Sequence, residues 1–380
     1  EKAVAVGPGP SVMRPAPSSP AAPLTAGSSP DSFARSNGVE MPDRGSGAPQ
    51  PVPEFNSSRM IVSILREICA ARGIELTGFS NDWIFLLRRG GRSTYVFGYD
   101  FSLNSATAKI ICKDKSATSD LLGFHGVPRI EHRIFHGPQL TGYVPLEGNW
   151  HPMLGYFEAC GRDVVCKPNE GSGGRGVLRA RTPAELEAAV VHVFEHNRSL
   201  CLSPYECIVG EYRVAVLRGA VQFAYGKERP MLVGDGRCNV RELLLERLKA
   251  AGNFASEIDG LAQAAKAGLD YTQVPGPGEE VVLNWRHNLA QGSVPNILDP
   301  RAPEVRAVCD LALRAASVLE VAVASVDVVL TPAGPKVLEI NAGIMMESLA
   351  RNLPEGRRLA RRFYDRIICA ALEIEDEAPP

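Results

Sequence analysis

Apolar and polar positions alternate along the chain with two periods, one typical of helices and one typical of strands. Over residues 58–72, apolar residues recur three and four positions apart, which places Ile61, Ile64, Leu65 and Ile68 on one face of a predicted helix. Short runs of β-branched residues, such as SVDVVL at 325–330, predict strands instead.

Applied to the whole chain, the pattern predicts a mixture of the two kinds of element. Helices are predicted over 58–72, 104–125, 150–160, 183–196, 239–250, 256–266, 303–320 and 355–372, and strands over 75–79, 82–88, 93–97, 127–135, 163–166, 177–179, 200–205, 211–217, 221–225, 280–285, 323–330 and 336–340. They follow one another without an internal repeat and without the even period of a doubly wound sheet. The predicted fold class is therefore α/β, of the α+β kind, with several mixed sheets and helices.

Residues 1–58 differ from the rest of the chain in composition. They contain 11 of the 29 prolines, much Ala, Ser and Gly, and almost no aromatic residues. Such a segment buries too little apolar surface to offset the entropy that ordering would cost. We expect 1–58 to be disordered and to be followed by a small α/β unit over 59–101.

Charge and cysteine usage exclude several classes of protein. The net charge of −2 provides no basic field for nucleic acid, and no apolar run reaches the 18 residues of a membrane span. The first thirty residues lack the apolar region of a signal peptide. The nine cysteines are scattered without a C-x-x-C pair, which indicates reduced thiols. We expect a cytoplasmic protein with no nucleic-acid or membrane partner; a homodimer is compatible with the sequence.

The stretch 163–179, DVVCKPNEGSGGRGVLR, combines a short strand, a lysine, a glycine-rich loop and a second strand. Glycine backbone can approach phosphate oxygens closely, because glycine has no Cβ and reaches positive φ. Lys167 adds a point charge beside the loop. This combination predicts a site for a polyphosphate.

Three alternatives compete for this loop. Gly171, Gly173 and Gly176 match the dinucleotide pattern G-x-G-x-x-G, but a strand rather than a helix is predicted after Gly176. The P-loop needs a G-K-[ST] triplet, which the stretch lacks. A flexible hairpin without a ligand remains open on these residues alone.

A second informative stretch is SVDVVLTPAGPKVLEIN, 325–341. Asp327 lies in a valine-rich strand, and Glu339 and Asn341 share one face of the next strand. A buried acid is unfavourable unless it is paired or bound to a metal. Two carboxylates and an amide oxygen suit Mg²⁺, and the alternative is pairing with nearby Arg or Lys.

Four motifs follow one another in a fixed order: DVVCKPNEGSGGRGV, GEYRVAVLRGAV, LVGDGRCNVRELL, and SVDVVL with VLEINAGIM. Together they resemble the ATP-grasp superfamily, most of all the branch of cyanophycin synthetase, glutathione synthetase and the ribosomal-protein glutamate ligase. The resemblance covers about residues 108–372. It implies an ATP-grasp fold, in which two α+β subdomains, 102–200 with the glycine-rich lid and 201–380 with the metal site, hold ATP between them.

The resemblance also implies roles for single residues. Lys115, in DKSATSDLL, and Lys167 would contact the nucleotide phosphates, and Gly171, Gly173, Gly174 and Gly176 would form a lid over them. A strand over 205–209 would bind adenine through Glu206, Ile208 or a neighbour, and Glu211 would hold the ribose. Arg213, Arg229, Arg286 and Asn288 would contact the phosphate or acyl phosphate, and Asp327, Glu339 and Asn341 would bind Mg²⁺ or Mn²⁺.

These roles imply an ATP-dependent, ADP-forming carboxylate–amine ligase that makes an amide or peptide bond through an acyl phosphate. The partners would be small amino acid or peptide substrates. Two alternatives stay open: an ATP-grasp kinase or thiol ligase, and an ATP-binding protein without catalysis. The acceptor pocket is built from the least recognisable segments, so the sequence does not identify the carboxylate or the amine.

Overall fold

The computed structural model of the 380-residue chain describes residues 59–140, 150–171, 173–229, 231–251, 269–283 and 294–376. All of these belong to one unit, Phe55–Pro380. The segment 1–58, which the sequence predicts to be disordered, and the helix predicted over 256–266 lie outside the described residues.

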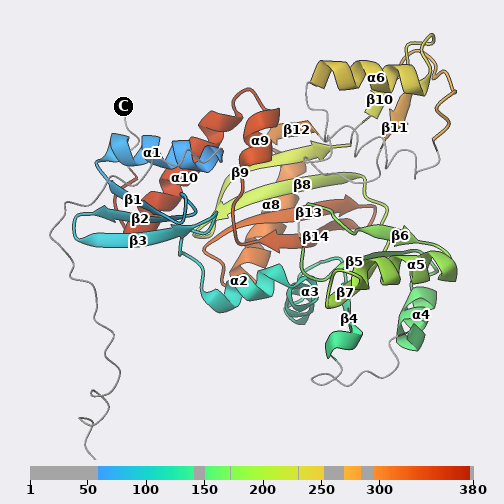
Figure 1. Cartoon of the computed structure of the whole chain (residues 1–380), viewed down its shortest axis with the longest axis horizontal. Helices are drawn as coiled ribbons and strands as arrows, with labels where there is room; N and C mark the ends of the chain where they lie inside the picture. The colour runs from blue at the N-terminus through green and yellow to red at the C-terminus, as the bar shows by residue number, and fades with distance from the viewer. Residues whose placement is uncertain are drawn as a thin grey trace, which may run out of the picture. The chain divides into compact units, whose positions relative to one another are not determined.

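A five-stranded antiparallel sheet forms the middle of the described unit (Figure 1). Its order is β12 (Val294–Leu298), β9 (Ala220–Glu228), β8 (Gly210–Leu217), β13 (Val323–Thr331) and β14 (Gly334–Asn341). The amphipathic helix α8 (Pro303–Val318) covers one face, where Val214, Val326 and Val328 pack against it. Since side chains alternate along a strand, Arg213 and Asp327 point to the opposite face.

A second antiparallel sheet carries the glycine-rich loop. Its order is β4 (Arg133–His136), β7 (Ser199–Pro204), β5 (Val164–Pro168) and β6 (Leu178–Ala180). Helices α4 (Trp150–Ala159) and α5 (Pro183–Phe194) bury their apolar faces in its core. Helix α5 begins at Pro183, as the sequence predicts, and the structure adds a capping box between Thr182 and Glu185.

The small α/β unit predicted near residue 59 contains helix α1 (Met60–Arg72) and a three-stranded sheet of β1 (Glu75–Phe79), β2 (Ile84–Arg89) and β3 (Arg92–Phe97). Helix α1 ends at Gly73, whose φ of 61° is left-handed. The hydrophobic core of this unit also contains residues of α10 (Gly356–Leu372), and Figure 1 shows α1 and α10 beside each other. The buried carboxylate of Glu347 accepts hydrogen bonds from the first backbone N–H groups of α1, at Met60 and Ile61.

The predicted ranges 104–125 and 127–135 differ clearly from the observed elements. The helix predicted over 104–125 is two helices, α2 (Ala106–Lys113) and α3 (Lys115–Phe124), because Asp114 between them adopts extended backbone and caps α3 by accepting the N–H of Ala117. The strand predicted over 127–135 is reduced to β4, since around Arg129 the chain makes only an isolated bridge to Val337.

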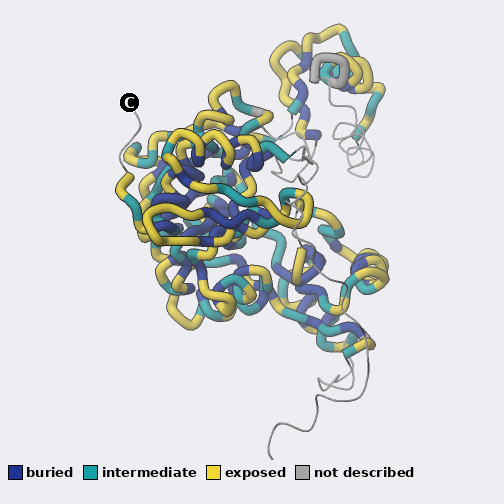
Figure 2. The backbone as a smooth tube through the Cα atoms, turned by 60° about the vertical axis from the view of Figure 1, so that its left-hand side comes forward, coloured by how far each residue is buried: buried dark blue, intermediate teal, exposed yellow. Residues whose placement is uncertain are grey.

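The remaining described elements are short or peripheral. They are the 3₁₀ turn η2 (Pro138–Leu140), the pair β10 (Met231–Val233) and β11 (Glu280–Val282) with helix α6 (Val240–Ala251), and helix α9 (Glu347–Asn352). Figure 2 shows the buried residues concentrated in the interior of the described unit. All nine cysteines are free thiols. In the described ranges no helix is both long and apolar enough to cross a bilayer.

Candidate functional site

The face of the five-stranded sheet opposite α8 carries a row of charged side chains. Asp327 in β13 is directly opposite Arg213 in β8 and directly opposite Glu339 in β14. A register shift between Asp327 and Val328 interrupts the β13–β14 pairing next to this row. Three adjacent strands therefore present a cation and two carboxylates to the same side of the sheet.

Asp327 is bound by two cations. Its carboxylate is 2% exposed and accepts bonds of 2.6 Å from both Nε and Nη2 of Arg213, while Lys227 Nζ lies 3.0 Å away. Lys227 also donates to Glu211 at 2.6 Å. Burial alone would raise the pKa of Asp327, but Arg213 and Lys227 outweigh it and hold that pKa well below its ordinary value.

Glu211 differs from Asp327 in its titration. Its carboxylate is buried and has Lys227 as its partner, yet burial outweighs the lysine and raises the pKa of Glu211. Burial lowers the pKa of Lys227, whereas Asp327 and Glu211 raise it, and the net direction is upward. The ion pairs join three buried groups, Asp327, Glu211 and Lys227, and the half-buried Arg213 in a row without net charge.

The two predicted Mg²⁺ carboxylates are thus not equivalent. Asp327 is paired with Arg213 and Lys227, which is the alternative to metal binding that the sequence left open. Glu339 accepts one hydrogen bond, 3.1 Å from Asn341 Nδ2, and has no ion pair within the described residues. That bond leaves the amide oxygen of Asn341 available, so Glu339 and Asn341 together offer hard oxygen ligands.

The described residues also bear on metal sites of other types. In the part of the chain that the structure describes, no three His, Cys, Asp or Glu side chains are arranged to hold a metal ion. The predicted trio contains only two carboxylates. It fits Mg²⁺ chemically through Glu339 and Asn341, while three of the roughly four acceptor positions of Asp327 are taken by N–H groups.

Two lysines approach from the other side. Lys167 lies in β5, is 8% exposed, and has no hydrogen bond or ion pair among the described residues. Burial lowers its pKa, nearby Lys115 lowers it further, and Glu339 opposes this effect. Lys115, the first residue of α3, donates from Nζ to the carbonyl of Gly171 at 2.9 Å. Both ammonium groups therefore lie close to the glycine-rich loop and within the field of Glu339.

The glycine-rich loop has the backbone that its composition predicts. Gly173, Gly174 and Gly176 have φ of 71°, 70° and 66°, a region that side chains with a Cβ disfavour. At Gly176 an added Cβ would also lie 3.2 Å from the ring of Pro168. Gly171 contributes its carbonyl to Lys115 instead.

The segment predicted as an adenine-binding strand, 205–209, is not a strand, because β7 ends at Pro204 and β8 begins at Gly210. Its ends are held by bonds from Tyr205 N to Asp163 O and from Val209 N to Leu330 O. Glu206 forms a 2.6 Å ion pair with Lys336.

Of the four predicted phosphate-contacting residues, the structure describes Arg213 and Arg229. Arg229 donates to the carbonyl of Ile208, in the segment between the two sheets, and Arg213 is bound to Asp327. Arg286 and Asn288 lie outside the described residues. Sequence reasoning missed Lys227, although the need of Glu211 and Asp327 for a countercharge was a signal for it.

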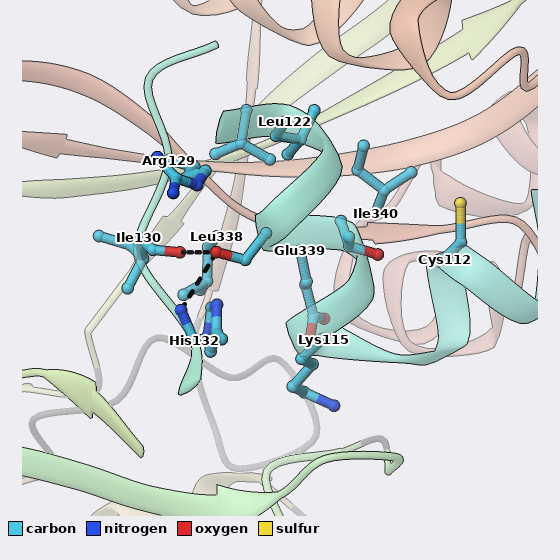
Figure 3. A pocket seen from close by; sticks show the side chains of 12 residues that line it. Cys112, Lys115, Leu122, Arg129, Ile130, His132, Leu338, Glu339 and Ile340 are labelled. Carbon is cyan, nitrogen blue, oxygen red and sulfur yellow. Dashed lines mark hydrogen bonds between the residues drawn. The ribbon is translucent and has the colours of Figure 1, made fainter. Parts of the chain in front are cut away.

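Space for ligands lies between these groups. A cavity of about 330 Å³ is lined by Lys109, Lys113 and Lys115, by Asp100, Cys112 and Gly171, and by residues 339–343. A second cavity of about 10 Å³ shares Cys112, Lys115, Glu339 and Ile340 with it and extends along α3 (Figure 3). Glu339 and Lys115 thus face solvent-accessible space rather than the core.

Comparison with known proteins gives distant matches. No protein-family model matches the sequence. A D-alanine–D-alanine ligase from Finegoldia magna is 25% identical over 107 residues, 28% of this chain and 27% of that enzyme. A bifunctional glutathione synthetase from Pasteurella multocida superposes with a TM-score of 0.51 at 18% identity, over 82% of this chain and 45% of its own. A D-alanine–D-alanine ligase from Bacillus anthracis complexed with ATP gives a TM-score of 0.44 at 17% identity, over 70% and 67%. The matches thus span less than half the length of the first two relatives.

Proposed function

We propose that this chain, which has the ATP-grasp ligase fold, is an ATP-dependent carboxylate–amine ligase that releases ADP. The observation that carries the proposal is that two lysines suited to bind phosphate lie near one carboxylate that has no ion pair among the described residues. Lys115 and Lys167 come from the glycine-loop side, and Glu339 comes from the five-stranded sheet. Such an arrangement suits a polyphosphate with a divalent metal, as expected for MgATP.

The nucleotide would lie between the two larger sheets. Lys115, Lys167 and the backbone of the glycine-rich loop would bind the phosphates, and the segment 205–209 would bind adenine. Because the Glu206 carboxylate is held by Lys336, we assign adenine recognition to the backbone of this segment. Glu211 would bind the ribose with its remaining acceptor positions.

Mg²⁺ or Mn²⁺ would be held by Glu339 and Asn341, with Asp327 supporting them from the neighbouring strand. When bound, the metal would neutralise charge on the transferring phosphoryl group. Arg213 and Lys227 already neutralise Asp327, so this carboxylate adds little negative charge where another anion must approach.

The chemistry needs cations and exclusion of water. A substrate carboxylate oxygen attacks the γ-phosphorus and ADP leaves, which forms an acyl phosphate. An amine then attacks the acyl carbon and inorganic phosphate leaves. Lys115 and Lys167 would reduce the repulsion between the carboxylate and ATP, and the glycine-rich loop would limit hydrolysis of the acyl phosphate by closing over the site. The cavity of about 330 Å³ beside Glu339 would accept an amino acid or a short peptide.

The test is a coupled assay for ADP and phosphate across a panel of amino acids and short peptides, with amide formation followed by mass spectrometry. We expect ADP and amide to appear in equal amounts, and only with Mg²⁺ or Mn²⁺. Release of AMP and pyrophosphate would refute the acyl-phosphate mechanism. Nucleotide binding without turnover on any substrate pair would favour a binding protein, and a phosphorylated product without amide would favour a kinase.

A further inference from the structure

His132 is a buried residue that has no role in the proposed reaction as described above. It is 2% exposed and lies between the end of α3 and β4. Its backbone N–H donates to Ser119 Oγ at 3.1 Å, and its carbonyl accepts from Ser116 Oγ at 3.0 Å. The backbone of His132 is therefore fixed on both sides by α3.

The ring has one satisfied and one unsatisfied nitrogen. Nε2 is buried and has no hydrogen-bond partner among the described residues, whereas a ring N–H makes a hydrogen bond to the backbone of Ile130. The bonded nitrogen is then Nδ1, which carries the proton and leaves a lone pair on Nε2. Burial, followed by the charges of Lys167 and Lys115, lowers the pKa of His132 well below its usual value, so the ring is neutral. Nε2 is thus an acceptor that needs a donor.

The donor has a defined place. His132 lines the cavity of about 10 Å³, which is about the room that one water needs. Figure 3 shows the His132 ring, the Glu339 carboxylate and the Lys115 side chain gathered at one end of this cavity, with Arg129 at the other end. Arg129 Nε is also buried without a partner, but it is a donor and lies away from Glu339. The thiol of Cys112 stays protonated, because burial raises its pKa to about 12.

We propose that His132 is a positioning residue, which fixes Glu339 through one buried water. The water donates one hydrogen to His132 Nε2 and the other to the Glu339 carboxylate. Two bonds lie within the usual range of two to four for a buried water. The arrangement orients the carboxylate assigned above to the metal, so the inference rests on the proposed function. Groups that orient a metal ligand typically change metal affinity by about 10- to 100-fold when removed.

Two substitutions separate this role from a structural one. In His132→Gln the amide oxygen reaches the position of Nε2, so the acceptor is kept. In His132→Asn the amide reaches the position of Nδ1, so the bond to Ile130 is kept and the acceptor is lost. Arg129→Gln is the control, because it changes the opposite end of the same cavity. Melting temperatures of all variants are recorded in parallel.

The readout is the affinity for Mn²⁺ in the presence of ADP, measured by electron paramagnetic resonance. We expect His132→Asn to weaken it by about tenfold, and His132→Gln and Arg129→Gln to stay close to wild type. If His132→Gln and His132→Asn bind Mn²⁺ equally well, or if His132→Gln binds it more weakly, the proposed role of His132 is refuted. The proposed function is not affected by that result. Absence of Mn²⁺–ADP binding by the wild type overturns the proposed function, and the inference with it. A high-resolution crystal structure adds a direct test, since a dry cavity at Nε2 would also overturn the inference.

Discussion

The row of charges on the central sheet makes a sharp prediction about two neighbouring acids. Asp327 and Glu339 are directly opposite each other, but only Asp327 is enclosed by cations. Replacing Asp327 by Asn keeps the shape and removes the charge. Replacing Glu339 by Gln makes the same chemical change on the next strand. The pair therefore separates the effect of charge compensation from that of the substitution itself.

The magnitude follows from the contacts. Asp327 receives two bonds of 2.6 Å from Arg213 and one contact of 3.0 Å from Lys227, and an amide can keep only those on its oxygen side. Bonds to charged groups contribute roughly 1.5–3 kcal/mol each, and breaking a buried pair costs about 3–5 kcal/mol because the partner charge stays buried. We expect Asp327→Asn to lower the free energy of unfolding by about 4 kcal/mol. For Glu339→Gln, which keeps its bond from Asn341, we expect a change within about 0.5 kcal/mol.

The assay is urea denaturation followed by circular dichroism, at several pH values. The pKa of Asp327 is lowered in the folded protein, so its contribution is fully present above its unfolded pKa and is lost as the pH falls toward the folded value. The difference between wild type and Asp327→Asn should thus be constant at neutral pH and shrink below about pH 3.9. Equal midpoints for Asp327→Asn and wild type at neutral pH would refute the ion-pair reasoning. Turnover should not follow stability. We expect Glu339→Gln to be well folded and almost inactive.

Further substitutions test the nucleotide side. Lys167→Ala should weaken ATP binding by about 2 kcal/mol, and unchanged affinity in calorimetry would remove this lysine from the site. Gly174→Val forces a β-branched residue to φ of 70°, so turnover should fall further than thermal stability; a collapse of the melting temperature would instead indicate a structural hairpin. Lys227→Met should destabilise the protein, because it leaves Glu211 buried without its cation, and an unchanged urea midpoint would contradict this. Deletion of 1–58 should keep turnover within about twofold, because that segment has too little apolar content to build a site, and a larger loss would contradict the expectation.

The elements that the sequence predicted best are those with local signals. Helix α5 has Thr182 as its cap and Pro183 in its first turn, and β13 and β14 lie close to the predicted ranges 323–330 and 336–340. The break between α2 and α3 was missed, since apolar spacing continues across Asp114 while the carboxylate caps the second helix. Local periodicity does not show when a polar side chain competes for backbone N–H groups.

The candidate site was predictable in its residue types and less so in its pairings. The sequence predicts Lys167 and the glycine-rich loop from their local pattern and Lys115 from the family resemblance, and in the structure these groups lie near Glu339. The bond between Arg213 and Asp327 joins strands far apart in sequence, so no local pattern reports it. Lys227 was missed because strand β9 was predicted to end at Tyr225. It continues to Glu228 because β12, whose VPNIL sequence contains a proline, pairs with its end.

The shared core of α1 and α10 has a consequence for how the protein is made. During synthesis α1 and the three strands after it leave the ribosome long before α10 does, and until then the apolar face that α10 covers stays open to water. Glu347, which caps α1, also arrives near the end of translation. Vectorial folding from the N-terminus is therefore blocked for this unit, and the first described segment completes its fold only with the last one. A nascent chain stalled before residue 347 should bind chaperones through α1 and β1–β3. A longer nascent chain, in which α10 has emerged, should release them.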